Sequence, residues 1–235
     1  SKTKAILLCN PCNPTGYVYS QEEITNIANL AKKNDLFIVV DEVYREFIYI
    51  DTKHFSILED EKFSENAILI DSTSKRYSLC GARVGFIVSK NSEFIQTCLK
   101  FALTRLSPPT LALIAANHAL NSGEDYIENV IKEYYKRREV VINELSQIDN
   151  IKFSNPMGAF YSMIKLPIEN AEDFAMFLLT DFSYKIHSVM LSPASGFYSS
   201  ENYGKDEVRI AFVLNSEKLK NAIKIIKLGL KEFIG

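Results

Sequence analysis

The chain has 235 residues, a formal net charge of −2 at pH 7, and a composition that is 47% hydrophobic and 24% charged. These values are ordinary for a globular protein with one large or two modest domains. They exclude the strongly basic balance of a nucleic-acid-binding domain. No apolar run approaches the ~20 residues that cross a bilayer, and no secretory signal pattern is present. We therefore expect no nucleic-acid or membrane partner and a cytoplasmic location.

Cysteine placement argues against a disulfide framework, because four cysteines are too few and too unevenly spaced for one. Cys9 and Cys12 form a Cys-x-x-Cys pair, a spacing that redox motifs and zinc sites also use. Turn residues follow the pair, whereas a redox pair normally begins a helix. No second pair or nearby histidine completes a zinc set. We predict neither a redox site nor a metal site.

The first segments alternate between strand and helix. The apolar run 5–9 predicts a strand buried on both faces, and the Pro- and Gly-rich stretch 10–16 predicts a turn. Ser20 with Glu23 is a capping box, which predicts the start of a helix that ends near Asn34. The run 36–40 predicts a second buried strand. Strand, helix and strand in this order are typical of a parallel unit.

Lys75 is the central residue of the candidate site. The run 67–70 predicts a third buried strand and 84–88 a fourth, so Lys75 follows a strand end, where open α/β folds bind ligands. Asn13 and Asp41 likewise follow the first two strands, and we expect all three side chains at one edge of the sheet. Hydroxyls and a guanidinium near Lys75 suit a phosphate, and they belong to Ser72, Ser74 and Arg83. This pattern predicts an amine nucleophile beside an anion site.

The second half of the chain contains helices and shorter elements. Residues 91–120 are expected to be helical with a break at Pro108–Pro109, and a long helix follows Gly123. Asn170 is expected to cap a further helix, 208–213 to form a strand, and 219–233 to form the last helix. Strand alternation places Arg209 on the face opposite Val208. Arg209 is either an edge arginine that reaches solvent or a bidentate clamp for a carboxylate.

Five motifs in this order resemble those of pyridoxal-phosphate-dependent aminotransferases of fold type I, class I/II, the aspartate-aminotransferase-like branch. The motifs are Asn-Pro-Cys-Asn-Pro-Thr-Gly at 10–16, Asp-Glu-Val-Tyr at 41–44, Ser-Thr-Ser-Lys at 72–75, Gly-Ala-Arg-Val-Gly at 81–85 and Val-Arg-Ile at 208–210. The resemblance implies an α/β fold: a partial large domain with a mostly parallel sheet flanked by helices, and a smaller C-terminal α+β domain, in the three-layer arrangement of this family.

The implied domain bounds are 1–122 for the C-terminal part of the large cofactor-binding domain, 123–148 for a linking helix and 149–235 for the small domain. Family members carry a long N-terminal portion ahead of the first motif, and we expect that portion to be missing here.

The resemblance also implies the role of each residue around pyridoxal 5'-phosphate. Lys75 would form the Schiff base and move the catalytic proton. Asp41 would pair with the pyridine nitrogen, which keeps the ring an effective electron sink. Asn13 and Tyr44 would hydrogen-bond the phenolate oxygen of the ring.

The phosphate and the substrate involve the remaining positions. Ser72 and Arg83 would hold the cofactor phosphate with help from Ser74. Arg209, together with Asn13, would bind the α-carboxylate of the amino acid. The position of Arg105 matches no family motif, and it is assigned no role.

The activity implied by the resemblance is ping-pong transamination between an α-amino acid and a 2-oxo acid, by a homodimer of the full-length protein. A pyridoxal-phosphate-dependent C–S β-lyase of the same fold shares all five motifs and is an alternative. A second alternative is a non-catalytic, aminotransferase-like sensor domain of a transcriptional regulator.

Overall fold

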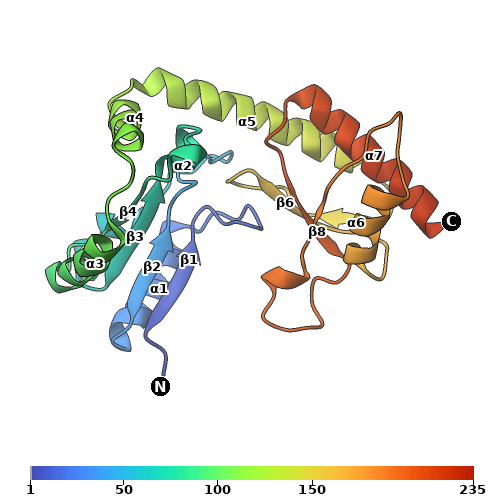
Figure 1. Cartoon of the computed structure of the whole chain (residues 1–235). Coiled ribbons are helices and arrows are strands. Elements are labelled where there is room, and N and C mark those ends of the chain that lie inside the picture. The colour runs from blue at the N-terminus through green and yellow to red at the C-terminus, as the bar shows by residue number, and fades with distance from the viewer. Residues whose placement is uncertain (1) are drawn as a thin grey trace. The chain divides into compact units, whose positions relative to one another are not determined.

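The computed structural model describes residues 2–235, which form two compact units (Figure 1). The first unit contains the residues up to Asn13 and Tyr17–Ile131, and the second contains Pro14–Gly16 and Lys132–Gly235. The division falls inside the long helix α5 (Glu124–Leu145).

The first unit is an α/β structure built on a four-stranded sheet. The strand order is β1-β2-β3-β4, with the first three strands parallel and the last antiparallel. The strands are β1 (Ala5–Cys9), β2 (Phe37–Asp41), β3 (Ala67–Ser72) and β4 (Gly85–Val88). The α-helices are α1 (Gln21–Lys33), α2 (Thr73–Arg76), α3 (Ser92–Arg105) and α4 (Thr110–Leu120), and the short 3-10 helices are η1 (Ile57–Glu59), η2 (Glu61–Phe63) and η3 (Cys80–Ala82). The predicted mostly parallel sheet with flanking helices is confirmed.

Local signals in the sequence place the first helix. Ser20 Oγ accepts a hydrogen bond from Glu23 N at 3.2 Å, and a Glu23 carboxylate oxygen accepts from Ser20 N at 2.8 Å. This reciprocal pair is the predicted capping box, and it satisfies donors that the first helical turn leaves without partners. Ile24 and Ala28 lie on the buried face of α1 and join a core that contains Ile38 and Val40 of β2.

Strand β1 differs from its prediction. We expected burial on both faces, but Leu7 is 74% exposed while Ile6 and Leu8 pack against the core. Successive side chains of a strand point to opposite faces, and in the described residues β1 pairs with β2 alone. An apolar run therefore located the strand correctly but did not reveal which of its faces is covered.

The second unit has an α+β structure. Its antiparallel sheet has the order β5-β6-β8-β7 and consists of β5 (Lys152–Phe153), β6 (Tyr161–Lys165), β7 (Ser192–Pro193) and β8 (Glu207–Ala211). Helices α6 (Ala171–Thr180) and α7 (Ser216–Ile234) lie side by side near this sheet in Figure 1, and η4 (Ser195–Phe197) follows β7. The rings of Phe174 and Phe233 pack 5.3 Å apart between the two helices. Asn170 caps α6, as predicted, by accepting from Glu172 N.

Within residues 2–235, no helix is both long enough and apolar enough to cross a membrane.

The capping box yields a stability prediction. Replacing Ser20 with Ala removes the acceptor for Glu23 N, so we expect the free energy of unfolding to fall by about 1 kcal/mol. Asn26→Ala, at an exposed interior position of the same helix, is the control, and it should be neutral or slightly stabilising because alanine has the higher helix propensity. Urea unfolding followed by circular dichroism measures both variants. Equal losses in the two would contradict a capping role for Ser20.

Candidate active site

The carboxyl ends of three parallel strands form one edge of the first sheet. Cys9 of β1 is in register with Asp41 of β2, and Asp41 is in register with Ile70 of β3. Asn13, Asp41 and Lys75 stand at or just beyond these strand ends, as the sequence predicted. Open α/β sheets bind their ligands at this edge.

Lys75 is presented by one turn of helix. Ser72, the last residue of β3, accepts a hydrogen bond from Ser74 N at 3.1 Å and so caps α2, which contains Lys75. Lys75 Nζ lies 5.8 Å from the centroid of the Tyr44 ring, a distance at which a cation is attracted to an aromatic face. Tyr44 is only 3% exposed, so its ring is a fixed surface beside the amine.

Asp41 is half-buried at the end of β2. Its Oδ1 accepts a hydrogen bond from Val43 N at 3.0 Å. Burial raises the pKa of the Asp41 carboxyl, the nearby Asp71 carboxylate raises it further, and the Val43 N–H and the Lys75 ammonium act in the opposite direction. Burial is the largest of these effects, and it destabilises the ionised form of Asp41. A cation placed against the carboxylate would stabilise that form and would therefore be bound favourably.

Asn13 is held close to the end of β1 through its backbone. Asn13 N lies 3.5 Å from Cys9 Sγ, and the Cys9 thiol itself donates to Pro11 O at 3.3 Å. Burial raises the pKa of Cys9 to about 12. A thiol with this pKa stays protonated at neutral pH and is therefore a weak nucleophile.

Ser72, Ser74 and Arg83 lie on the wall of a cleft of about 1100 Å³ in the first unit, and Arg105 and the apolar side chains of α3 line it as well. Ser72 Oγ is 2.8 Å from Ser74 Oγ and 2.9 Å from Val84 O. Arg83 is exposed, adopts a left-handed backbone conformation (φ 58°) and donates from Nη1 to Cys80 O at 2.9 Å. The structure therefore brings two hydroxyls and a guanidinium to one cleft.

Arg209 belongs to the second unit and lies on β8. Its guanidinium carbon is 4.7 Å from the centroid of the Tyr161 ring and 4.9 Å from that of Phe197. Tyr161 is 7% exposed and Phe197 is 43% exposed. The two rings contact the guanidinium and thereby orient it, which is unlike the free surface arginine of the alternative interpretation.

The sequence model of the family described as "Aminotransferase class I and II" matches residues 1–226 of the chain. The chain belongs to this family. Aminotransferases of class I and II generally use pyridoxal phosphate.

Individual aminotransferases are similar to the chain over nearly all of its length. It is 33% identical to the aspartate aminotransferase of Bacillus sp. (strain YM-2) over 234 residues, which cover 96% of this chain and 57% of that protein. It is 34% identical to the (5-formylfuran-3-yl)methyl phosphate transaminase of Methanocaldococcus jannaschii, with 96% of this chain and 57% of that protein covered. The solved aromatic aminotransferase from Pyrococcus horikoshii OT3 superimposes with a TM-score of 0.88 at 31% identity, covering 99% of this chain and 61% of that one. The chain thus spans less than two thirds of the length of these aminotransferases.

The structure contains one buried ion pair that the sequence pattern did not predict. Arg76 Nη2 lies 2.7 Å from both carboxylate oxygens of Asp71, and the two residues are 5% and 9% exposed. Arg45 Nη2 approaches Asp71 at 3.5 Å, and Arg76 Nη1 approaches Glu46 at 3.4 Å. Of these charges, the Asp71 carboxylate acts on Asp41, whose pKa it raises. The order of residues alone gives no sign that Arg76 faces inward while its neighbour Lys75 faces the edge.

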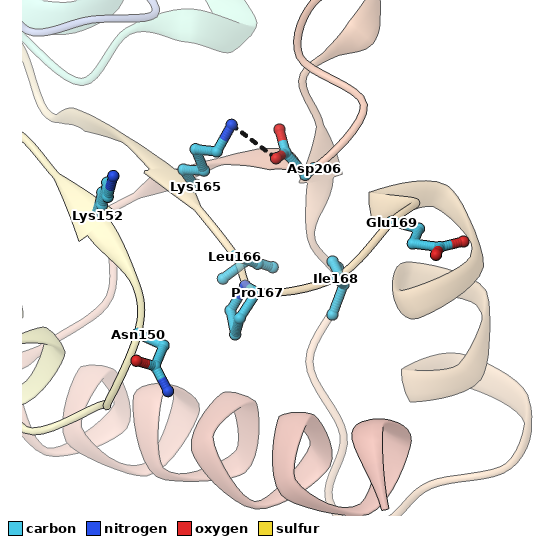
Figure 2. Close-up of a pocket in the computed structure, with 8 residues that line it drawn as sticks. All are labelled: Asn150, Lys152, Lys165, Leu166, Pro167, Ile168, Glu169 and Asp206. Carbon is cyan, nitrogen blue, oxygen red and sulfur yellow. Dashed lines mark ion pairs between the residues drawn. The ribbon is translucent and has the colours of Figure 1, made fainter.

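A second hollow, of about 370 Å³, lies in the second unit and contains none of the predicted site residues (Figure 2). Lys165 and Asp206 point toward each other there, with Nζ and Oδ2 2.7 Å apart. Both side chains are partly exposed, so this ion pair is an ordinary surface contact.

The Asp71–Arg76 pair should be essential to stability. Arg76→Met leaves a buried carboxylate without its closest cation, and we expect the free energy of unfolding to fall by about 3–5 kcal/mol. In the double variant Asp71→Asn/Arg76→Met the loss should be smaller than the sum of the two single losses. Lys90→Met, which breaks the exposed contact with Glu61 in the same unit, is the control and should cost less than about 1 kcal/mol. Additive losses in a denaturant-unfolding cycle would show that Asp71 and Arg76 are not coupled.

Proposed function

We propose that this chain supplies active-site residues of a pyridoxal-phosphate-dependent aminotransferase, which moves an amino group from an α-amino acid to a 2-oxo acid in two half-reactions. The observation that carries the proposal is the convergence at one sheet edge of the Lys75 amine, the Tyr44 ring and the half-buried Asp41 carboxyl. The membership in the aminotransferase family supports it.

The residues present fit the cofactor chemically. Burial raises the pKa of Asp41 because it destabilises the ionised carboxylate. The positive charge of a protonated pyridine nitrogen would stabilise that carboxylate. Ser72, Ser74 and Arg83 line one cleft, and together they offer the hydroxyl and guanidinium donors that a phosphate dianion requires. An amine, an anion for the ring nitrogen and donors for a phosphate are therefore all found in the first unit.

Pyridoxal phosphate, when bound, supplies an electron sink that stabilises negative charge at the substrate Cα. Lys75 Nζ would hold the cofactor and then accept the proton that leaves the substrate Cα, as a general base. The Asp41 carboxylate would accept the ring N–H, while Asn13 and Tyr44 would donate hydrogen bonds to the phenolate oxygen. Ser72, Ser74 and Arg83 would fix the phosphate.

Arg209 would bind the α-carboxylate of the substrate, with Asn13 as a second donor. The support for this assignment is the contact of the guanidinium with two aromatic rings, which limits its rotation. A guanidinium that is oriented before binding loses less entropy when it forms a bidentate contact with a carboxylate.

The resemblance to the family also supports a proposal for the domain bounds and the assembly. A large domain would end near residue 122, residues 123–148 would form a linking helix, and 149–235 would form the small domain. The full-length protein would act as a homodimer in the cytoplasm on amino-acid and 2-oxo-acid substrates.

Covalent trapping tests the role of Lys75. The chain is incubated with pyridoxal phosphate and reduced with borohydride, and the adduct is mapped by mass spectrometry. We expect one major adduct, on the peptide that contains Lys75. Lys75→Ala should lose it and Lys90→Ala should keep it, because Lys90 is an exposed lysine outside the site. Wild-type chain with adducts spread evenly over many lysines would overturn the proposal.

Turnover separates the proposed activity from C–S cleavage. We expect amino-group transfer that depends on an added 2-oxo acid and falls by about 10²–10⁴-fold or more in Lys75→Ala, the range for loss of a general base. Sustained release of pyruvate and ammonia from cystathionine without a 2-oxo acid would instead indicate a β-lyase.

The phosphate assignment predicts a selective loss of affinity. Arg83→Gln removes a charge-assisted contact worth about 1.5–3 kcal/mol, so affinity for pyridoxal phosphate should fall by roughly 10–100-fold. Affinity for pyridoxal, which has no phosphate, should change little. Titration of the cofactor absorbance measures both ligands, and a parallel loss for both would contradict a phosphate-binding role for Arg83.

A further inference from the structure

The end of β2 carries a buried glutamate that the proposed mechanism does not use. Glu42 is 0% exposed. Its Oε1 accepts hydrogen bonds from Ser56 Oγ at 2.9 Å and from Ile57 N at 3.1 Å. Its Oε2 is buried and has no hydrogen-bond partner among the described residues, and His54 Nδ1 lies 3.9 Å away from it. A carboxylate oxygen buried without a donor is costly unless it carries a proton or meets a cation.

The hydrogen bonds of His54 fix the position of its ring proton. His54 Nε2 is 3.2 Å from Asn10 O, and a carbonyl oxygen can only accept, so Nε2 carries the hydrogen. In a neutral ring, Nδ1 then presents a lone pair toward Glu42 Oε2. Two acceptors cannot face each other favourably in a buried site. One proton on either atom removes the conflict.

The surroundings favour the carboxyl as the site of that proton. Burial raises the pKa of Glu42 from 4.5 to about 7, against the hydrogen bonds from Ser56 and Ile57. Burial also lowers the pKa of His54, against its contact with Asn10 O. Both directions favour the neutral form of each group.

Charged neighbours act on the pair as well. The Arg45 cation favours ionised Glu42 and disfavours protonated His54, whereas Asp71 acts in the opposite sense on Glu42. Glu46 and Glu59 favour protonated His54. These effects are smaller than that of burial on each group.

The pair is connected to the edge that carries the candidate site. Asn10 is fully buried, and besides its carbonyl contact with His54 it donates from N to Asp41 O at 2.9 Å. Its Oδ1 accepts from Tyr19 N at 3.0 Å. Asn10 begins the turn that leads to Asn13. The His54 contact therefore holds the base of this turn against the backbone of Asp41.

We propose that Glu42 and His54 hold one proton between them and act as positioning residues, which keep the Asn10–Asn13 turn in place beside Asp41. The positioning of cofactor-binding residues rests on the proposed function, whereas the shared proton does not. Glu42 has a raised pKa in the folded chain, so the stability gained from its neutral form is fully present below pH 4.5 and is lost as the pH rises through about 7. The turn should respond in the same pH range.

Nuclear magnetic resonance of the uniformly ¹⁵N-labelled chain tests the proposal without any cofactor. The chain has three histidines, so His118→Gln and His187→Gln assign the His54 ring signals. We expect His54 to be the Nε2–H tautomer. Its Nδ1 shift and the backbone amide shifts of Asn10 and Asn13 should move together with one midpoint near pH 7.

Variants of Glu42 separate positioning from simple packing. Glu42→Gln imitates the protonated carboxyl, because its amide can donate to His54 Nδ1 while its oxygen still accepts from Ser56 and Ile57. It should keep the tautomer and abolish the shared midpoint near pH 7. Glu42→Leu should keep the Nε2–H tautomer, which the Asn10 carbonyl fixes, and also lack the midpoint near pH 7. Because leucine cannot donate to His54 Nδ1, its Asn10 and Asn13 amide shifts should depart from those of Glu42→Gln. Glu65→Gln, at an exposed position, should behave as wild type.

The outcomes separate this proposal from the proposed function. An Nδ1–H tautomer, or a midpoint near pH 7 that persists in Glu42→Gln, would overturn the shared proton. Asn10 and Asn13 amides that ignore the titration would overturn the positioning role. A chain that shows the coupled titration but forms no borohydride-trapped adduct would support the pair and count against the proposed function alone.

Discussion

The parallel pairing of β1, β2 and β3 is the constraint on which the candidate site depends. Because the three strands run in one direction with Cys9 opposite Asp41 and Asp41 opposite Ile70, their polar ends share one edge. Side chains alternate between the faces of a strand, so a slip of β2 by one residue would exchange the environments of Asp41 and Glu42. The partly exposed carboxyl would then be buried and the buried one presented to the edge. The register thus decides which acid can meet a ligand.

Much of this arrangement could be predicted from the sequence, because its signals are local. Continuous apolar runs bounded by turn residues located the strands, and Ser20 with Glu23 located a helix start through a contact three residues apart. Parallel topology follows from strand, helix and strand in succession. Once the topology is given, residues that directly follow the strands must share an edge. Asn13, Asp41 and Lys75 could therefore be grouped without coordinates.

The buried charges could not be predicted in the same way, because their partners are set by tertiary packing. Arg76 follows Lys75 directly, and only the path of α2 turns it toward Asp71. Glu42 and His54 lie on either side of an irregular segment, so no periodic pattern connects them. The prediction that both faces of β1 are buried was wrong at Leu7 for a related reason. A run of apolar residues carries no information about what covers each face of a strand.

The carboxyl groups at this edge are compensated in different ways, and the differences explain how acids can be crowded at one end of a sheet. Asp71 is paired with Arg76, whose Nη2 lies 2.7 Å from its Oδ1. Glu42, with burial raising its pKa to about 7 and His54 beside it, is best stabilised by keeping a proton. Asp41 is compensated less. Its Oδ1 accepts a hydrogen bond from the backbone N–H of Val43, and burial raises its pKa. If Asp71 or Glu42 lost its compensation, the added negative charge would raise the pKa of Asp41 further and weaken its ionised form. The Arg76 cation and the Glu42 proton therefore help to leave Asp41 as the acid at this edge whose charge is available to a cationic ligand.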